Sequence, residues 1–125
     1  MYQYHARADA MAVLTGEMIG LHDRRAESGT LEGETLTLHF PQGFWVSGKH
    51  PASPGGKPMV TGESTVTFRT AEDITVYLYR EEAGRTIREE SSAAALLELL
   101  NSKGYSLEFL YPYYGWRSFR FDCWL

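Results

Sequence analysis

The sequence contains a single cysteine, Cys123, among its 125 residues. One thiol cannot form an internal disulfide, so a disulfide-stabilised scaffold is excluded and a reducing compartment is favoured. No window of 18 apolar residues occurs, and no membrane-spanning helix is therefore predicted. The first 18 residues also lack the basic and apolar regions of a secretory signal, although a mature chain could have lost one. We therefore expect a cytoplasmic protein with no membrane partner.

The sequence also lacks a basic surplus. Twelve lysines and arginines stand against 16 aspartates and glutamates, which gives a formal net charge of −4. Proteins that neutralise a phosphate backbone normally carry excess positive charge. A single-stranded nucleic acid would have to bind Arg117 and Arg120 beside Trp116, where the positive charge is weak. We therefore expect no nucleic-acid partner.

Short motifs typical of well-known active sites are absent as well: G-x-S-x-G, H-E-x-x-H, the P-loop and G-x-G-x-x-G do not occur. The four histidines are widely spaced, so neither a metal site nor a cofactor is predicted. His39 falls on the outward face of a predicted strand and His50 in a long loop, where we expect both to be solvated. Catalysis would need a carboxylate that the fold brings to one of these two histidines. These four histidines are His5, His22, His39 and His50.

What the sequence does contain is enough apolar material for a core. Hydrophobic residues make up 43% of the chain and aromatic residues 14%, which argues against disorder. A chain of this length has the size of one domain and can bury a core without a disulfide or a metal. We therefore predict that residues 1–125 form a single globular domain.

Alternation of apolar and polar residues predicts most of the strands. Residues 34–40 place Leu36, Leu38 and Phe40 on one face, and residues 61–70 do the same with two further apolar residues. Residues 25–33, which are polar and carry two glycines, are predicted to form a turn. Further predictions are strands at 17–24 and 44–46, a hairpin joining 74–80 to 85–90, a functional or mobile loop at 47–58, and either an edge strand at 2–7 or a helix at 6–14.

Residues 92–103 are the one segment with a helical pattern. Ser91 or Ser92 would cap its first turn, and Gly104 would end it. Its buried stripe would consist of Ala93, Leu96, Leu97 and Leu100, which must cover part of a sheet. The predicted fold is therefore mainly β in the α+β class: an antiparallel β-sandwich or partly open barrel of about seven to nine strands, with this helix packed on it.

A C-terminal hairpin, 105–111/117–125, is predicted to close the fold. A three-residue loop at 113–115 would put Gly115 where a positive φ is needed. That register pairs Phe109 with Phe119 and sets Glu108 opposite Arg120. It also places Tyr111 and Cys123 on the inward rows, so the thiol would be buried and inert.

Aromatic residues are the only enriched feature, and several fall where a core does not need them. Aromatic side chains with a polar group are favoured at interfaces. The leading hypothesis is therefore a non-catalytic protein-binding module whose partner is a protein or its own copy, with a homodimer through the edge of the last hairpin as one form. The alternative is a small-ligand or sugar site lined by Trp45, Tyr113 and Trp116; a small enzyme is the third hypothesis. The predicted binding residues are Trp45, Tyr113, Tyr114, Trp116, Arg117, Arg120 and Trp124.

Overall fold

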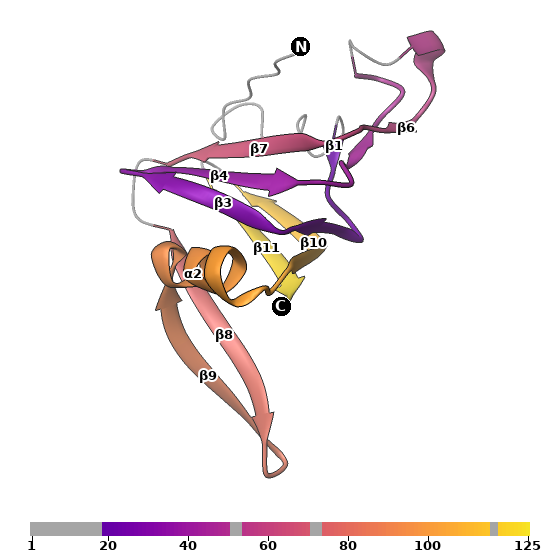
Figure 1. Cartoon of the computed structure of the whole chain (residues 1–125). Coiled ribbons are helices and arrows are strands. Elements are labelled where there is room, and N and C mark those ends of the chain that lie inside the picture. Colours follow the sequence, from indigo (N-terminus) through magenta and orange to yellow (C-terminus); the bar gives the residue numbers. More distant parts are fainter. Residues whose placement is uncertain (1–18, 51–53, 71–73, 116–117) are drawn as a thin grey trace.

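The computed structural model describes residues 19–50, 54–70, 74–115 and 118–125 (Figure 1). Strands account for 58% of these residues, and the described part of the chain has one α-helix. The strands form several antiparallel sheets, and none of those described closes into a barrel. This confirms a mainly β, α+β fold with one helix and a C-terminal hairpin. The alternatives for residues 2–14 lie outside the described residues.

The central sheet has the order β3-β4-β7. Alternation in β4 buries Leu36, Leu38 and Phe40 on one face, as predicted, and leaves polar side chains on the other. Two apolar residues of β7, Val66 and Phe68, pack against the same core. The strands of this sheet are β3 (Ser28–Glu32), β4 (Thr35–Phe40) and β7 (Ser64–Arg69).

The predicted turn over residues 25–33 is wrong, because most of this segment is strand. β3 pairs with β4 from Ser28 opposite His39 to Glu32 opposite Thr35, so only two residues turn the chain between them. Gly29 does not break the strand; it allows a close approach. A Cβ atom there would lie 2.5 Å from a backbone oxygen of β4 and 2.8 Å from the side chain of Leu97.

The helix α2 (Ala93–Lys103) covers part of β3 (Figure 1). Ser92 caps it: its hydroxyl accepts a hydrogen bond from the amide of Ala95 at 3.1 Å. Gly104, with a φ of 74°, ends it in the left-handed region. Asn101 joins the helix to the free edge of β3, since its side-chain amide bonds the N–H and the carbonyl of Gly29, each at 2.9 Å. The predicted stripe of Ala93, Leu96, Leu97 and Leu100 is buried.

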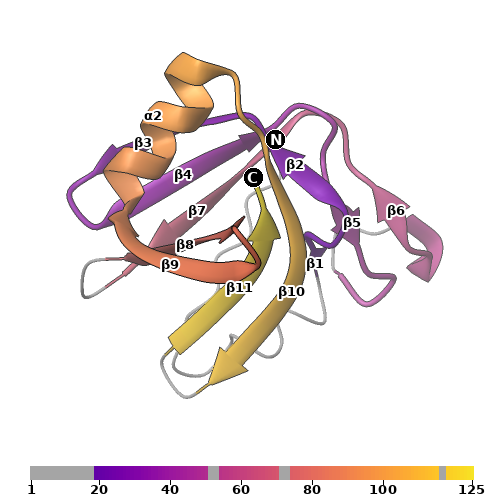
Figure 2. The ribbon, with the colours of Figure 1, turned by 90° about the horizontal axis from the view of Figure 1, so that it is seen from below.

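The second sheet has the order β11-β10-β2, so the C-terminal hairpin forms with β10 in the middle (Figure 2). Its register differs from the predicted one. Gly115 pairs with Ser118, and Phe109 pairs with Cys123. The three-residue loop at 113–115 is therefore wrong. The strands are β2 (Arg24–Ala26), β10 (Leu107–Gly115) and β11 (Ser118–Trp124).

A β-bulge at Leu110 changes the face on which the following residues of β10 lie. The register shifts between Phe109 and Tyr111, so one residue of β10 has no partner on β11. A strict alternation of faces assumes that no such residue exists. Tyr111 consequently lies on the outward face and is 58% exposed, whereas the pattern had placed it inward.

Two smaller sheets complete the fold. In the hairpin formed by β8 and β9, the turn residues Ala83 and Gly84 both have positive φ, 50° and 76°, as a tight two-residue turn requires. This hairpin projects away from the other sheets beyond α2 (Figure 1). The remaining elements are β1 (Ile19–Gly20), β5 (Trp45–Val46), the 3-10 helix η1 (Pro54–Gly56), β6 (Met59–Val60), β8 (Thr75–Glu82) and β9 (Arg85–Ser92).

The core lies between the central sheet, α2 and the inward face of the C-terminal hairpin. Phe40, fully buried, packs against Phe44 and Phe109 with ring centroids 5.8 and 5.6 Å apart. Phe121 packs edge-on against Phe68 and Phe109. None of the described helical residues makes a helix long and apolar enough to cross a membrane.

Candidate functional site

The outward face of the C-terminal hairpin carries most of the predicted binding residues that the structure describes. Beyond the bulge, Tyr111 of β10 stands opposite Asp122 of β11, and Tyr113 stands opposite Arg120. Trp124 follows on the same row of β11, since side chains two residues apart share a face. We call this surface the hairpin aromatic face; it consists of Tyr111, Tyr113, Arg120, Asp122 and Trp124.

The large side chains of this face are open to solvent. Trp124 is 66% exposed and Tyr113 is 48% exposed. The guanidinium of Arg120 lies over the Tyr113 ring, 4.3 Å from its centroid, and its Nε is 3.5 Å from a carboxylate oxygen of Asp122. Tyr113 and Asp122 therefore hold the guanidinium of Arg120 on this face.

Sequence reasoning missed the residues that set the orientation of this face. His22 donates from Nδ1 to the carbonyl oxygen of Leu110 at 2.6 Å, because a carbonyl can only accept. The amide of Asp23 donates to the carbonyl of Phe109 at 2.8 Å, with Asp23 itself at a φ of 59°. The segment before β2 thus binds both sides of the bulge. No local pattern could reveal it, because the partners are 88 residues apart.

Other predicted binding residues are not brought to this face. Trp45 lies on β5, in another sheet, with the guanidinium of Arg24 5.1 Å from its ring centroid. The side chain of Tyr114 and the residues Trp116 and Arg117 lie outside the described part of the structure.

Two hollows are lined by described residues, and neither contains Trp45 or Tyr113. The first adjoins the bulge and holds about 60 Å³, far less than the several hundred that a ligand pocket needs. The second, of about 270 Å³, is open and lies over the outward face of the central sheet. The predicted sugar site is therefore not found in either. The second hollow is lined by Ser28, Gly29, Thr30, Thr37, His39, Thr65 and Asn101.

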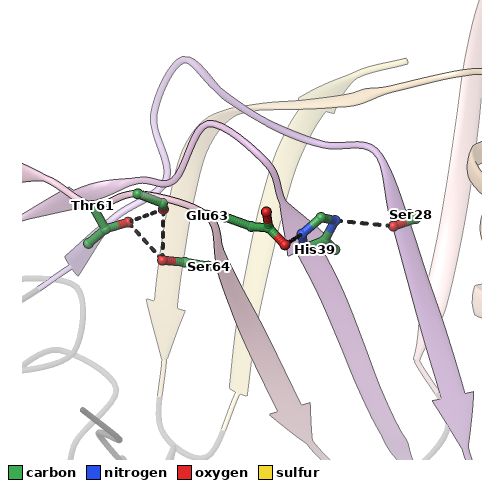
Figure 3. A network of polar contacts seen from close by, with 6 residues as sticks. Ser28, His39, Thr61, Glu63 and Ser64 are labelled. Carbon is green, nitrogen blue, oxygen red and sulfur yellow. Dashed lines mark hydrogen bonds and ion pairs between the residues drawn. The ribbon is translucent and has the colours of Figure 1, made fainter. Parts of the chain in front are cut away.

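His39 borders this second hollow and joins two polar side chains (Figure 3). Its Nε2 lies 3.0 Å from Oε1 of Glu63, and its Nδ1 lies 3.4 Å from the hydroxyl of Ser28. A carboxylate accepts, so Nε2 donates to Glu63, and in the neutral ring Nδ1 is left to accept from Ser28. The fold therefore brings a carboxylate to His39, one of the two histidines at which catalysis would require one.

The bend that carries Glu63 is held by hydroxyl groups. Thr61 accepts a hydrogen bond from the amide of Phe44 at 3.1 Å, and its hydroxyl also lies 2.9 Å from that of Ser64 (Figure 3). The Glu63 side chain itself is 75% exposed. The backbone that presents the carboxylate is therefore fixed, but the carboxylate is open to water.

The structure also describes His50 and Cys123, the two other residues considered for chemistry. His50 is buried at 5% exposure, so the expectation that it is solvated is wrong. Desolvation, with a smaller contribution from Asp122, raises the pKa of Cys123 to about 12. That agrees with an inert thiol. Among the described residues, no three His, Cys, Asp or Glu side chains are grouped as metal ligands.

The hairpin aromatic face and the contacts of His39 with Ser28 and Glu63 are thus defined by geometry alone. Comparisons with models of protein families, with curated proteins and with solved structures find no match for this chain.

Proposed function

We propose that this protein is a non-catalytic protein-binding module and that its partner docks on the hairpin aromatic face. The observation that carries the proposal is the exposure of Tyr111, Tyr113 and Trp124 on one side of one hairpin. Large aromatic side chains and arginine are the residues that contribute most to protein interfaces. These exposed aromatic side chains are not part of the core, and an interface is the role that we propose for them.

Contacts within the face hold part of it in place before binding. β10 is paired with β11 along most of its length and with β2 at Leu107–Phe109. Arg120 is already held by Tyr113 and Asp122 before a partner arrives, so little side-chain freedom remains to be lost on binding. A binding surface that is ordered in advance loses less conformational entropy than a flexible one.

The shape of the face supports a protein partner over a sugar. Its residues alternate along two paired strands. Tyr111 borders the first hollow, which holds only about 60 Å³, and neither hollow includes Tyr113 or Trp124. Small ligands are usually bound in concave pockets that enclose most of their surface. An exposed face with aromatic side chains and an arginine that is already held matches the centre of a protein interface instead.

The test is affinity capture with the double variant Tyr113→Ala/Trp124→Ala. We expect proteins retained by the wild type to be lost with this variant, while circular dichroism shows that the fold is unchanged. Trp45→Ala is the matched control, because Trp45 is 45% exposed but lies on another sheet. Equal capture by wild type and double variant, or equal loss in the control, contradicts the assignment of binding to this face.

A second function is supported by one observation, the placement of His39 between Ser28 and Glu63 (Figure 3). A histidine that accepts from a serine hydroxyl and donates to a carboxylate can act as general base for that serine. The Ser28 oxygen would attack an electrophile while its proton moves to Nδ1 of His39, and Glu63 would stabilise the resulting imidazolium. The exposure of Glu63 and the 3.4 Å distance to Ser28 make this the weaker proposal.

A fluorophosphonate probe tests the serine directly. The Ser28 oxygen would bond to phosphorus, fluoride would leave, and the adduct would be located by peptide mass spectrometry. We expect labelling to be lost in Ser28→Ala and His39→Ala but kept in Ser64→Ala, because Ser64 has a hydroxyl and a carbonyl as neighbours and no histidine. A wild type that is not labelled rules out the serine site without affecting the binding proposal.

A further inference from the structure

The hairpin of β8 and β9 extends from the body of the protein as a two-stranded arm (Figure 1). In the part of the chain that the structure describes, β8 pairs only with β9. Two-stranded ribbons are at best marginally stable in water without a further strand or a covering layer. The arm nevertheless carries apolar side chains along its length: Tyr77 and Tyr79 are 45% and 64% exposed on one face, and Leu78 and Ile87 are half-buried on the other.

The two open edges of this arm differ in charge. Charged side chains make up the middle of β9: Arg88, Glu89 and Glu90. Charges along an edge strand discourage pairing with another chain. β8 has no charged residue from Thr75 to Tyr79, and its residues there are the β-branched, leucine and aromatic types that favour strands. The edge of β8 is therefore the unprotected one.

The turn determines which backbone groups lie on that edge. In a two-residue hairpin the closing pair, here Glu82 and Arg85, exchanges hydrogen bonds, and bonded pairs then alternate along the ladder. The N–H and C=O groups of Thr75, Tyr77 and Tyr79 consequently point to the outer edge of β8. They match the spacing that a further antiparallel strand would need.

We propose that β8 pairs with β8 of a second copy of this chain, antiparallel and about a two-fold axis at Leu78. In this register Tyr77 faces Tyr79 of the partner, and Leu78 faces its own counterpart. The open N–H and C=O groups of both strands are then satisfied, and a four-stranded sheet replaces two isolated ribbons. This proposal goes beyond the binding function of the hairpin aromatic face and does not depend on it.

Side-chain matching favours this register. Centring the axis on Arg80 would oppose two arginines, and centring it on Tyr79 would set both Leu78 and Val76 against charged residues of the partner. Centring on Leu78 opposes no like charges and sets only one aliphatic residue, Val76, against a charged one, Arg80 of the partner. It also uses the strand from Thr75 to Glu81, pairs aromatic with aromatic twice, and joins the apolar side chains of both arms into one strip.

The first experiment measures mass by light scattering over about a hundredfold range of concentration. The wild type is expected to reach twice the 14.2 kDa of the chain. Leu78→Lys puts two positive charges at the axis and is expected to raise the dissociation constant at least about tenfold. Ile87→Lys is the matched control, since it is half-buried on the same face but on β9, and it should keep the dimer. A monomeric wild type, or equal effects of the two variants, overturns the proposal.

A cross-link gives a readout that survives changes in stability. In a Cys123→Ser background, Leu78→Cys would face its counterpart across a non-hydrogen-bonded pair, where Cα atoms are about 4.5 Å apart and a disulfide can form. We expect covalent dimers of Leu78→Cys under mild oxidation and none of Ile87→Cys at the same concentration. Equal cross-linking of both variants, or none in either, contradicts pairing through β8.

Discussion

The Nδ1 atom of His22 lies 2.6 Å from the carbonyl oxygen of Leu110, which is the bulged residue of β10. The bulge decides which side chains reach the outward face: without it, Tyr111 would point to the core and the aromatic row would be broken. The contact therefore connects a residue near the start of the described chain with the proposed binding face. It also gives the carbonyl of the bulged residue a hydrogen bond.

Replacing His22 by alanine should lower the free energy of unfolding by about 1 kcal/mol, because the Leu110 carbonyl loses its donor. Urea unfolding followed by tryptophan fluorescence measures the change. His22→Asn, whose side-chain amide can still donate, is the control and should recover part of the loss. Identical midpoints for wild type and His22→Ala would show that the contact does not hold the bulge.

Much of the fold could be predicted because its signals are local. The alternation of Leu36, Leu38 and Phe40 and the stripe of Leu96, Leu97 and Leu100 each follow from the period of one element. What failed was the position of turns and bulges. The strands of the C-terminal hairpin pair as far as Gly115 and Ser118, so the turn predicted at 113–115 gave a wrong register. The bulge at Leu110 has no signature in the sequence of β10 itself, and it put Tyr111 on the face opposite to the predicted one.

The candidate site was only partly predictable for a related reason. Arg120, Tyr113 and Trp124 share the outward face because period-two alternation holds along each arm on either side of the bulge. The pairing of His39 with Glu63 depends on a bend that is held by bonds between Thr61 and Ser64 and by a bond from Phe44, which is 17 residues from Thr61, and no spacing of histidines and carboxylates could reveal it.

Replacing Gly29 by alanine should destabilise the protein by about 1–3 kcal/mol. The new methyl group would lie 2.5 Å from the backbone oxygen of Thr37 and 2.8 Å from Leu97, so β3 or α2 must shift. Gly62→Ala is the matched control: nothing lies within 4 Å of its Cβ position, and a change within about 0.5 kcal/mol is expected. Thermal unfolding by circular dichroism compares the two. A Gly29→Ala protein as stable as Gly62→Ala would mean that α2 does not pack closely on β3.

The contributions of Ser91 and Ser92 to stability can be distinguished in the same way. Ser92→Ala removes the hydroxyl that accepts from the Ala95 amide and should cost about 1 kcal/mol. Ser91→Ala, one residue earlier, leaves that bond intact and should change stability by less than about 0.5 kcal/mol. Urea titration of both variants measures the difference. A larger loss of stability in Ser91→Ala than in Ser92→Ala would mean that Ser92 does not cap the helix.

The thiol of Cys123 provides a prediction about pH. Its pKa is about 12 in the folded protein against an ordinary value of 9.0, because burial and the nearby Asp122 carboxylate disfavour the thiolate. Between these two values the folded protein holds a proton that the unfolded chain releases. The stability that this group contributes is therefore complete below pH 9 and is lost as the pH rises toward 12.

Alkylation by iodoacetamide measures this difference, because only the thiolate reacts. At pH 9 about half of the thiol in an unfolded chain is ionised, but only about one part in a thousand in the folded protein. We expect the native protein to react far more slowly than the same protein in urea, as followed by intact mass, and Cys123→Ser to gain no label. Reaction at equal rates in both states would show that the thiol is as accessible and as acidic in the fold as in the free chain.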